Sequence, residues 1–126
     1  PNESEAAILA GNPVGNRADA EAAAVGLLRL GIETVILTLG SQGSLLAGRD
    51  VVQRYPPYDV EPVDTTAAGD AFVGGLAVAL TEGRSLPDAV RWGNAAGALA
   101  TTKLGAQPSL PTRIAVQHLL SAGSLR

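Results

Sequence analysis

The stretch Val63-Asp64-Thr65-Thr66-Ala67-Ala68-Gly69-Asp70-Ala71-Phe72 is the most informative part of this 126-residue chain. It leads into a segment of small and apolar residues, Ala68–Thr81, which predicts a helix closed by Gly83. The first N–H groups of a helix have no partner within it, and the helix dipole favours negative charge there. Because residues 67–69 carry no bulky side chains, an anion can approach their N–H groups closely. The stretch therefore predicts an anion hole of the kind that stabilises a transferring phosphoryl group.

Asp70 follows this predicted anion site directly, where a second negative charge is electrostatically unfavourable. The sequence leaves two interpretations open. Asp70 is either an ordinary acidic residue in the first turn of a helix, where carboxylates are common, or a general base. A carboxylate within reach of a substrate hydroxyl could accept its proton while the hydroxyl oxygen attacks phosphorus.

Four other segments carry helix signals. Asn2 and Glu5 form a capping-box pattern ahead of an apolar run that Gly11 ends. Each of the other three begins at an Asn, Ser or Thr, whose side chains cap helices well. The expected ranges are 17–30 after Asn16, with Val25, Leu27 and Leu28 as the buried stripe, 86–103 after Ser85, and 113–120 after Thr112.

The segment Thr34–Leu39 is short, β-branched and apolar on both faces, which is typical of a central strand covered on both sides. Gly40–Gly43 breaks this strand. Two shorter strands, Ser44–Ala47 and Val51–Arg54, flank a turn and predict a small antiparallel hairpin. The alternation of helices and strands favours an α/β fold, and the length favours one domain with one hydrophobic core.

Composition excludes several classes of function. The net charge is −3 and the basic residues are scattered, so nucleic-acid binding is not expected. The chain has no cysteine and one histidine, which excludes thiolate chemistry and multi-histidine metal sites. No apolar run is long enough to span a bilayer, and the first residues lack signal-peptide features. We expect a cytoplasmic protein with no membrane contact.

The sequence Asp64-Thr65-Thr66-Ala67-Ala68-Gly69-Asp70 resembles the C-terminal signature of the ribokinase-like, PfkB-type carbohydrate kinases, Asp-Thr-x-Gly-Ala-Gly-Asp. Ala67 replaces the commoner glycine, a variant typical of the ribokinase branch. Three further segments resemble the family in the same order along the chain. They are Asn2-Glu3-Ser4-Glu5, Thr38-Leu39-Gly40-Ser41-Gln42-Gly43 and Gly105-Ala106-Gln107-Pro108-Ser109.

This resemblance implies a three-layer α/β/α, Rossmann-like fold with a small antiparallel hairpin. Residues 1–126 would be its C-terminal nucleotide-binding and catalytic-base part. The resemblance makes Asp70 the general base and assigns the anion hole to Ala67, Ala68 and Gly69. Asn2 and Glu5 would influence Mg²⁺ and phosphate binding through water, although the capping box explains them equally well. The residues expected to contact ATP are Thr38, Gly40, Ser41, Gly43, Gly69 and Asn94.

A monovalent cation, expected to be K⁺, is implied as well. Asp64 would offer its carboxylate, and Ser109 a hydroxyl or carbonyl oxygen. Thr66, Ala100, Lys103 and Gly105 would offer main-chain carbonyls. An all-oxygen set of ligands suits a hard cation. The alternative for Asp64 is the capping of a turn.

The family's Gly-Gly-Lys-Gly-Ala-Asn motif, sugar-binding half and lid have no counterpart here, so we expect an incomplete kinase. The resemblance separately implies that the parent protein is a homodimer. The implied activity is ATP-dependent phosphorylation of D-ribose at its terminal hydroxyl. Another PfkB-type sugar or nucleoside kinase and a noncatalytic nucleotide-binding module are alternatives. A dinucleotide-binding domain is disfavoured, because the first strand is not followed by G-x-G-x-x-G.

Overall fold

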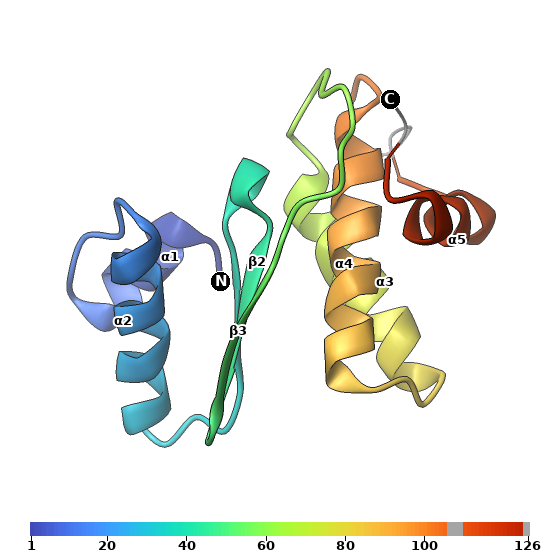
Figure 1. Cartoon of the computed structure of the whole chain (residues 1–126). Helices are drawn as coiled ribbons and strands as arrows, with labels where there is room; N and C mark the ends of the chain where they lie inside the picture. Colours follow the sequence, from blue (N-terminus) through green and yellow to red (C-terminus); the bar gives the residue numbers. More distant parts are fainter. Residues whose placement is uncertain (106–109, 125–126) are drawn as a thin grey trace. The chain divides into compact units, whose positions relative to one another are not determined.

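The computed structural model of the chain describes residues 1–105 and 110–124. Its helices and small antiparallel sheet confirm the α/β class, although in the described residues the strands are grouped between helices and do not alternate with them (Figure 1). The elements are α1 (Glu3–Ala10), α2 (Arg17–Arg29), β1 (Val35–Thr38), the 3₁₀ turn η1 (Gly40–Gln42), β2 (Ser44–Gly48), β3 (Val51–Tyr55), α3 (Ala68–Thr81), α4 (Leu86–Thr101) and α5 (Arg113–Ala122). The predicted helices and the hairpin are confirmed, with bounds that shift by one or two residues.

The chain divides into two compact units, unit 1 (Pro1–Pro56) and unit 2 (Pro57–Arg126). Each unit has its own cluster of buried apolar residues. The single hydrophobic core expected from the chain length is therefore not what the structure contains. The predicted site residues are distributed over both units, and each unit is described separately below.

Unit 1 is a three-stranded sheet covered by two helices. The strand order is β1-β2-β3 and both pairings are antiparallel, with Val35 opposite Ala47 and Ala47 opposite Val52. Helices α1 and α2 pack on this sheet through a core of small side chains. The buried stripe of α2 consists of Ala20, Ala23, Ala24 and Leu27, so the predicted stripe was right only at Leu27. Val25 and Leu28 are half-buried.

Strand β1 differs from its prediction as a doubly covered central strand. Among the described residues it pairs only with β2, at the edge of the sheet. Its buried and half-buried residues alternate, as in a strand that faces a core on one side. A short apolar run reads alike in both settings, so the sequence could not distinguish them.

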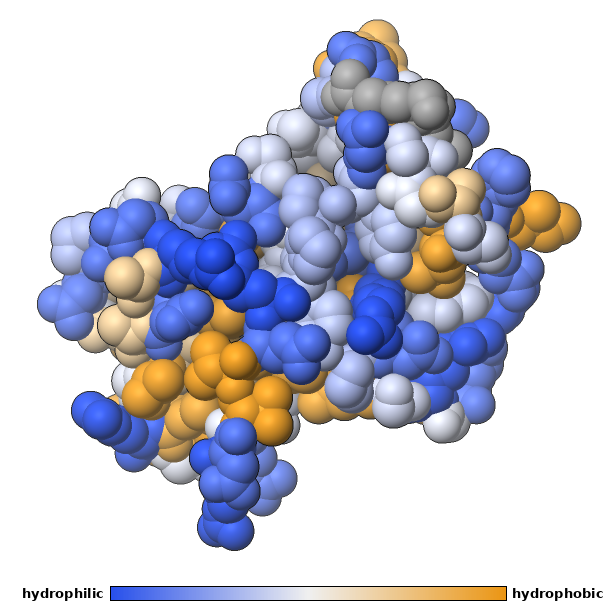
Figure 2. All heavy atoms as spheres, viewed as in Figure 1, coloured by the Kyte–Doolittle hydropathy of each residue, from blue (hydrophilic) through white to orange (hydrophobic). Residues whose placement is uncertain are grey.

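Unit 1 exposes several large apolar side chains at one end of its sheet. Leu30, Ile32, Val51 and Val52 are each at least 45% exposed, and Figure 2 shows apolar side chains gathered over the lower part of this unit. Val51 and Val52 pair with the end of β2 that also faces Val35. The Gly40–Gly43 loop lies at the other end of β1, so these apolar residues are remote from the predicted nucleotide loop.

Unit 2 is built on the antiparallel pair α3 and α4, with α5 packed against α4 (Figure 1). Glycines allow α3 and α4 to approach closely. A Cβ atom at Gly75 would lie 2.8 Å from the Cβ of Ala96, and one at Gly93 would lie 2.9 Å from the Phe72 ring. Such distances leave no room for a side chain, so the Ala- and Gly-rich composition of these helices follows from their packing.

Trp92, the only tryptophan of the chain, is buried in unit 2 beneath two guanidinium groups. The Cζ atom of Arg84 lies 4.6 Å from the ring centroid, and that of Arg113 lies 5.7 Å from it. Arg113 also donates a hydrogen bond to Glu82 at 3.1 Å. This bond holds the pKa of Glu82 below its usual value. Cation–π contacts and an ion pair thus connect the loop after α3 and the start of α5 to the middle of α4.

Candidate functional site

The first turn of α3 is the centre of the candidate site. Its N-cap is Ala67, whose side chain offers no hydrogen-bond acceptor. The N–H group of Ala68 donates to the Thr65 carbonyl at 3.2 Å. Among the described residues, the N–H groups of Ala67, Gly69 and Asp70 have no hydrogen-bond partner. Two of the three predicted donors are therefore unpaired, and Asp70 adds one that the sequence analysis missed.

The carboxylate of Asp70 is exposed on this same turn. Within the part of the chain that the structure describes, it forms no hydrogen bond and no ion pair. A carboxylate that serves as a helix cap or a salt-bridge partner would be occupied. Asp70 is not, so its lone pairs are available to accept a proton from a bound hydroxyl.

The turn before α3 is fastened to the C-terminal end of α4. The Thr101 carbonyl accepts hydrogen bonds from the N–H groups of Val63, at 2.6 Å, and Asp64, at 2.9 Å. Asp64 Oδ1 accepts from the N–H and the hydroxyl of Thr66, and Oδ2 accepts from the Gly105 N–H at 3.0 Å. These hydrogen bonds lower the pKa of Asp64 below its ordinary value, and the bond from the Thr66 hydroxyl has a larger effect than those from the Gly105 and Thr66 amides. Asp64 is therefore an ionised carboxylate that caps its own turn.

Two of the predicted cation ligands contact the Asp64 carboxylate, and the others are placed only by their positions along the chain. The hydrogen bonds of Asp64 bring Thr66 and Gly105 to it. Ala100 and Lys103 lie in and just after the last turn of α4. Three of the last four carbonyls of α4 accept hydrogen bonds. Those of Ala98 and Leu99 accept from threonine hydroxyls, and that of Thr101 accepts from the amides of residues 63 and 64. Among the described residues, the fourth, that of Ala100, accepts no hydrogen bond. Ser109 lies outside the described residues.

In unit 1, Asn2 and Glu5 form the predicted capping box. The Asn2 side chain accepts from the Glu5 N–H, and the Glu5 side chain accepts from the Asn2 N–H, both at 2.9 Å. The N–H of Thr38 donates to the Pro1 carbonyl at 2.9 Å, which places the end of β1 beside the start of α1. The capping interpretation is confirmed. Both side chains are also exposed, so one oxygen of Glu5 stays accessible to solvent.

The Gly40–Gly43 loop, which ends β1 as the sequence predicts, forms the short 3₁₀ turn η1. Gly40 has a φ of 56° and Gly43 a φ of 87°, a region that favours glycine. A Cβ atom at Gly40 would lie 3.8 Å from a carboxylate oxygen of Glu3. The predicted ATP-contacting residues of unit 1, Thr38, Gly40, Ser41 and Gly43, therefore share one end of the sheet with the start of α1.

Asn94 is buried in α4, with 8% of its surface exposed. Asn94 is predicted from the resemblance to contact ATP; the alternative, a partly exposed residue of the helix, is wrong because the side chain is buried. Its neighbour Gly93 packs against the Phe72 ring, so this part of α4 faces α3.

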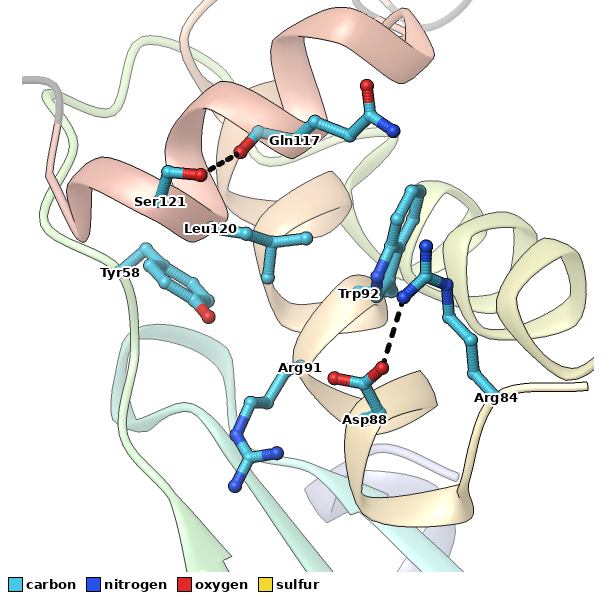
Figure 3. Close-up of a pocket in the computed structure, with 8 residues that line it drawn as sticks. All are labelled: Tyr58, Arg84, Asp88, Arg91, Trp92, Gln117, Leu120 and Ser121. Atoms are coloured by element: carbon cyan, nitrogen blue, oxygen red, sulfur yellow. Dashed lines mark hydrogen bonds and ion pairs between the residues drawn. The ribbon is translucent and has the colours of Figure 1, made fainter. Parts of the chain in front are cut away.

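Unit 2 also contains an open pocket of about 470 Å³ along the N-terminal half of α4 (Figure 3). Its lining residues are Tyr58, Arg84, Asp88, Arg91, Trp92, Gln117, Leu120 and Ser121. Burial raises the pKa of Tyr58 above its ordinary value, and Arg91 partly offsets this effect. Arg84 donates to Asp88 at 3.2 Å. None of the predicted site residues lines this pocket, which belongs to the opposite end of α4 from Asp64.

The described chain contains no cluster of three or more His, Asp or Glu side chains that could hold a metal ion. No helix within residues 1–105 and 110–124 has the length and apolar character required to cross a membrane.

Comparison with known proteins identifies the family. The model of the pfkB family carbohydrate kinases matches residues 1–113. The chain belongs to this family. A ribokinase of Haemophilus influenzae is 45% identical over 113 residues, which cover 90% of this chain and 37% of that relative. Fructokinase-1 of Oryza sativa is 41% identical over 103 residues, 76% of this chain and 32% of the relative. The chain thus spans about a third of the length of each of these two curated relatives.

Solved structures of the pfkB family share the fold. Arabidopsis thaliana ribokinase, complexed with ribose and ATP, gives a TM-score of 0.89 at 36% identity. That match covers 95% of this chain and 39% of that one. Phosphofructokinase-2 of Escherichia coli, in complex with potassium, gives a TM-score of 0.87 at 30% identity, over 98% of this chain and 40% of that one. These similarities confirm the predicted ribokinase-like fold.

Two features of the site were not predicted from the sequence. The Thr101 carbonyl anchors the turn that carries Asp64, and Gly97 lets α4 approach the first turn of α3. A main-chain acceptor leaves no signature in a side-chain pattern. A glycine within a helix does carry a signal, because it is unfavourable there unless close packing requires it.

Proposed function

We propose that this chain supplies the nucleotide-binding and base-bearing part of an ATP-dependent kinase that phosphorylates D-ribose at its terminal 5-hydroxyl. The observation that carries the proposal is the first turn of α3. It combines an uncapped row of N–H donors with an unpaired carboxylate, in a chain of the pfkB family. The ribokinase relatives support ribose as the acceptor. The chain matches 39% of a solved ribokinase chain. The sugar-binding residues would therefore come from a part of the kinase outside this sequence.

In the proposed reaction, a carboxylate oxygen of Asp70 accepts the proton of the sugar hydroxyl. The hydroxyl oxygen forms a bond to the γ-phosphorus of ATP, and the bond from phosphorus to the β,γ-bridging oxygen breaks. The products are the sugar phosphate and ADP. Negative charge spreads over the γ-phosphoryl oxygens during transfer, and the N–H groups of Ala67, Gly69 and Asp70 would stabilise it, whereas that of Ala68 donates to the Thr65 carbonyl.

The remaining contacts to ATP would come from Thr38, Gly40, Ser41 and Gly43 in unit 1 and from Asn94 in unit 2. Mg²⁺ bound to the phosphates would neutralise part of their charge. Asn2 and Glu5 would hold waters of that ion with the atoms that the capping box leaves free. The shared location of α1 and η1 at one end of unit 1 supports this grouping.

A monovalent cation, K⁺, fits the oxygen-rich end of α4. The donors are the ionised Asp64 carboxylate and main-chain carbonyls of Thr66, Ala100, Lys103 and Gly105, with Ser109 completing the set. The unpaired Ala100 carbonyl and the lowered pKa of Asp64 support this assignment. Bound there, a cation would add positive charge next to the turn that leads into the anion hole.

Two alternatives follow from the sequence. The similarity to fructokinase supports another sugar as the acceptor. The second alternative is a noncatalytic nucleotide-binding module built on the same fold. The unpaired Asp70 carboxylate favours catalysis over the second alternative, because a pure binding module has no use for a carboxylate beside an anion site.

The base assignment is tested in a chimera that carries residues 1–126 in place of the matching segment of the Haemophilus influenzae ribokinase. We expect ribose-dependent ADP release, and a loss of about 10²- to 10⁴-fold in kcat in Asp70→Asn. ADP release that persists in Asp70→Asn would rule out Asp70 as the base. A parallel chimera with the Oryza sativa fructokinase tests the acceptor. Higher activity there, on fructose, would favour the fructokinase alternative.

A further inference from the structure

Gly97 stands where helix α4 passes closest to the first turn of α3. It is buried, and a Cβ atom at this position would lie 3.1 Å from the Ala68 carbonyl oxygen and 3.6 Å from the Phe72 Cβ. A contact of 3.1 Å requires the neighbour to move by a few tenths of an ångström. The neighbour here is main chain, which cannot swing aside as a flexible side chain can.

The Ala68 carbonyl and the Gly69 N–H belong to the same peptide group. A peptide group is planar and rigid, so a displacement of its oxygen moves its N–H as well. The Gly69 N–H is one of the unpaired donors of the proposed anion hole. The absence of a side chain at Gly97 therefore bears directly on where that donor points.

Helix α4 also fixes the other side of the site. One turn beyond Gly97, the Thr101 carbonyl holds the amides of Val63 and Asp64. The four residues from Gly97 to Thr101 correspond to about 6 Å along a helix. A single turn of α4 thus sets the orientation of the Gly69 donor and the position of the turn that leads into it.

We propose that Gly97 is a positioning residue for phosphoryl transfer. Its missing side chain lets α4 hold the Ala68–Gly69 peptide so that the Gly69 N–H points at the γ-phosphate. This inference rests on the proposed function. Alanine is the better helix former, so helix propensity alone would not favour glycine at this position.

The test compares the affinities of the 126-residue chain for MgATP and MgADP, because only ATP carries the γ-phosphate. Gly97→Ala should reduce the preference for ATP over ADP by about fivefold, since a misdirected charge-assisted hydrogen bond is weakened. Two control variants separate positioning from folding. In Gly74→Ala the new methyl meets open space, so neither stability nor the ratio should fall.

Gly75→Ala is the structural control, because its Cβ would lie 2.8 Å from the Cβ of Ala96 in the same helix pair. It should lower the melting temperature while it leaves the ATP-to-ADP ratio intact. If Gly97→Ala alone folds poorly, the double variant Gly74→Ala/Gly97→Ala should recover helix stability. The ratio of the affinities for MgATP and MgADP is then measured in the double variant. An unchanged ratio in a folded Gly97 variant would overturn the inference.

A second readout needs no nucleotide. Gly97→Ala should shift the amide NMR resonance of Gly69 more than Gly75→Ala does. If the unmodified chain binds neither nucleotide, the proposed function fails, yet the resonance still decides the geometric claim. A Gly69 amide that is unmoved in Gly97→Ala would contradict that claim.

Discussion

Helices α1 and α3 begin in opposite ways. At α1, the side chains of Asn2 and Glu5 occupy each other's main-chain N–H groups in a reciprocal capping box. At α3, the cap is Ala67, and the amides of Gly69 and Asp70 have no partner among the described residues. The other helices of the described chain resemble α1, because Asn16, Ser85 and Thr112 each accept a hydrogen bond from an amide three residues on.

The difference separates two uses of the same donors. A capped start satisfies its amides locally, which stabilises the helix by about 1 kcal/mol. An uncapped start gives up that stabilisation and keeps its amides and its dipole for an external anion. The close packing of α3 against α4 offers a stabilisation of α3 that does not depend on a cap.

The largest expected effect comes from a charge placed at the uncapped start. Gly69→Asp should weaken MgATP binding at least about tenfold, because the added carboxylate repels the phosphates. The fold should tolerate it, since the Gly69 side-chain position is open and acidic residues are favourable in a first turn. Isothermal titration calorimetry measures the affinity, and thermal unfolding checks the fold.

Two controls make this test specific. Gly69→Asn has nearly the same shape without the charge and should retain most of the affinity. Ala18→Asp introduces the same carboxylate at the corresponding position of the capped helix α2, where the side chain is exposed. It should leave MgATP binding unchanged. Equal losses in Gly69→Asp and Ala18→Asp would mean that the start of α3 is not an anion site.

Removal of a cap should have an intermediate effect. Asn16→Ala and Asn2→Ala should each lower the free energy of unfolding by about 1 kcal/mol, because each leaves a helix amide without its acceptor. Only Asn2→Ala should also weaken the Mg²⁺-dependent part of ATP binding. Denaturant unfolding and ATP titrations with and without Mg²⁺ measure the two quantities. If the two variants behave alike in both assays, Asn2 is a cap and nothing more.

Acidification should have the smallest effect, confined to the turn before α3. The pKa of Asp64 is lower in the folded chain than its ordinary value, so its hydrogen bonds contribute stability above that ordinary value. This contribution is lost as the pH falls through the lowered pKa. In an NMR titration toward low pH, the amide signals of Thr66 and Gly105 should stay constant as the pH passes the ordinary aspartate pKa. The two signals should then shift together at lower pH. A midpoint at or above the ordinary aspartate pKa, about 3.9, would contradict this.

Local signals in the sequence predict much of this fold. The starts of α2, α4 and α5 follow from Asn16, Ser85 and Thr112, because a cap and the amide that it accepts are only three residues apart. Strand pairing is less predictable. The apolar run of β1 suits a buried central strand as well as an edge strand with one buried face, and only its partners distinguish the two.

The candidate site shows the same limit. The unpaired start of α3 is predictable from Ala67, Ala68 and Gly69, since small residues there offer no cap. The bond from the Gly105 amide to Asp64 joins residues 41 positions apart, and the contact of Gly97 with Ala68 depends on how two helices are aligned. Spacing along the chain carries no information on either. Family resemblance placed Asp64 and Gly105 together only as cation ligands and did not predict this hydrogen bond, and nothing in the sequence suggested the contact of Gly97 with Ala68.

Trp92 makes unit 2 observable on its own. It is the chain's sole indole, it is nearly inaccessible to solvent, and two arginines cover it. Its fluorescence should therefore report the melting of residues 57–126 alone, whereas circular dichroism sums the helices of the whole chain. A spectroscopist can thus ask, without any added label, whether the two halves of this polypeptide melt as a single cooperative block or one after the other.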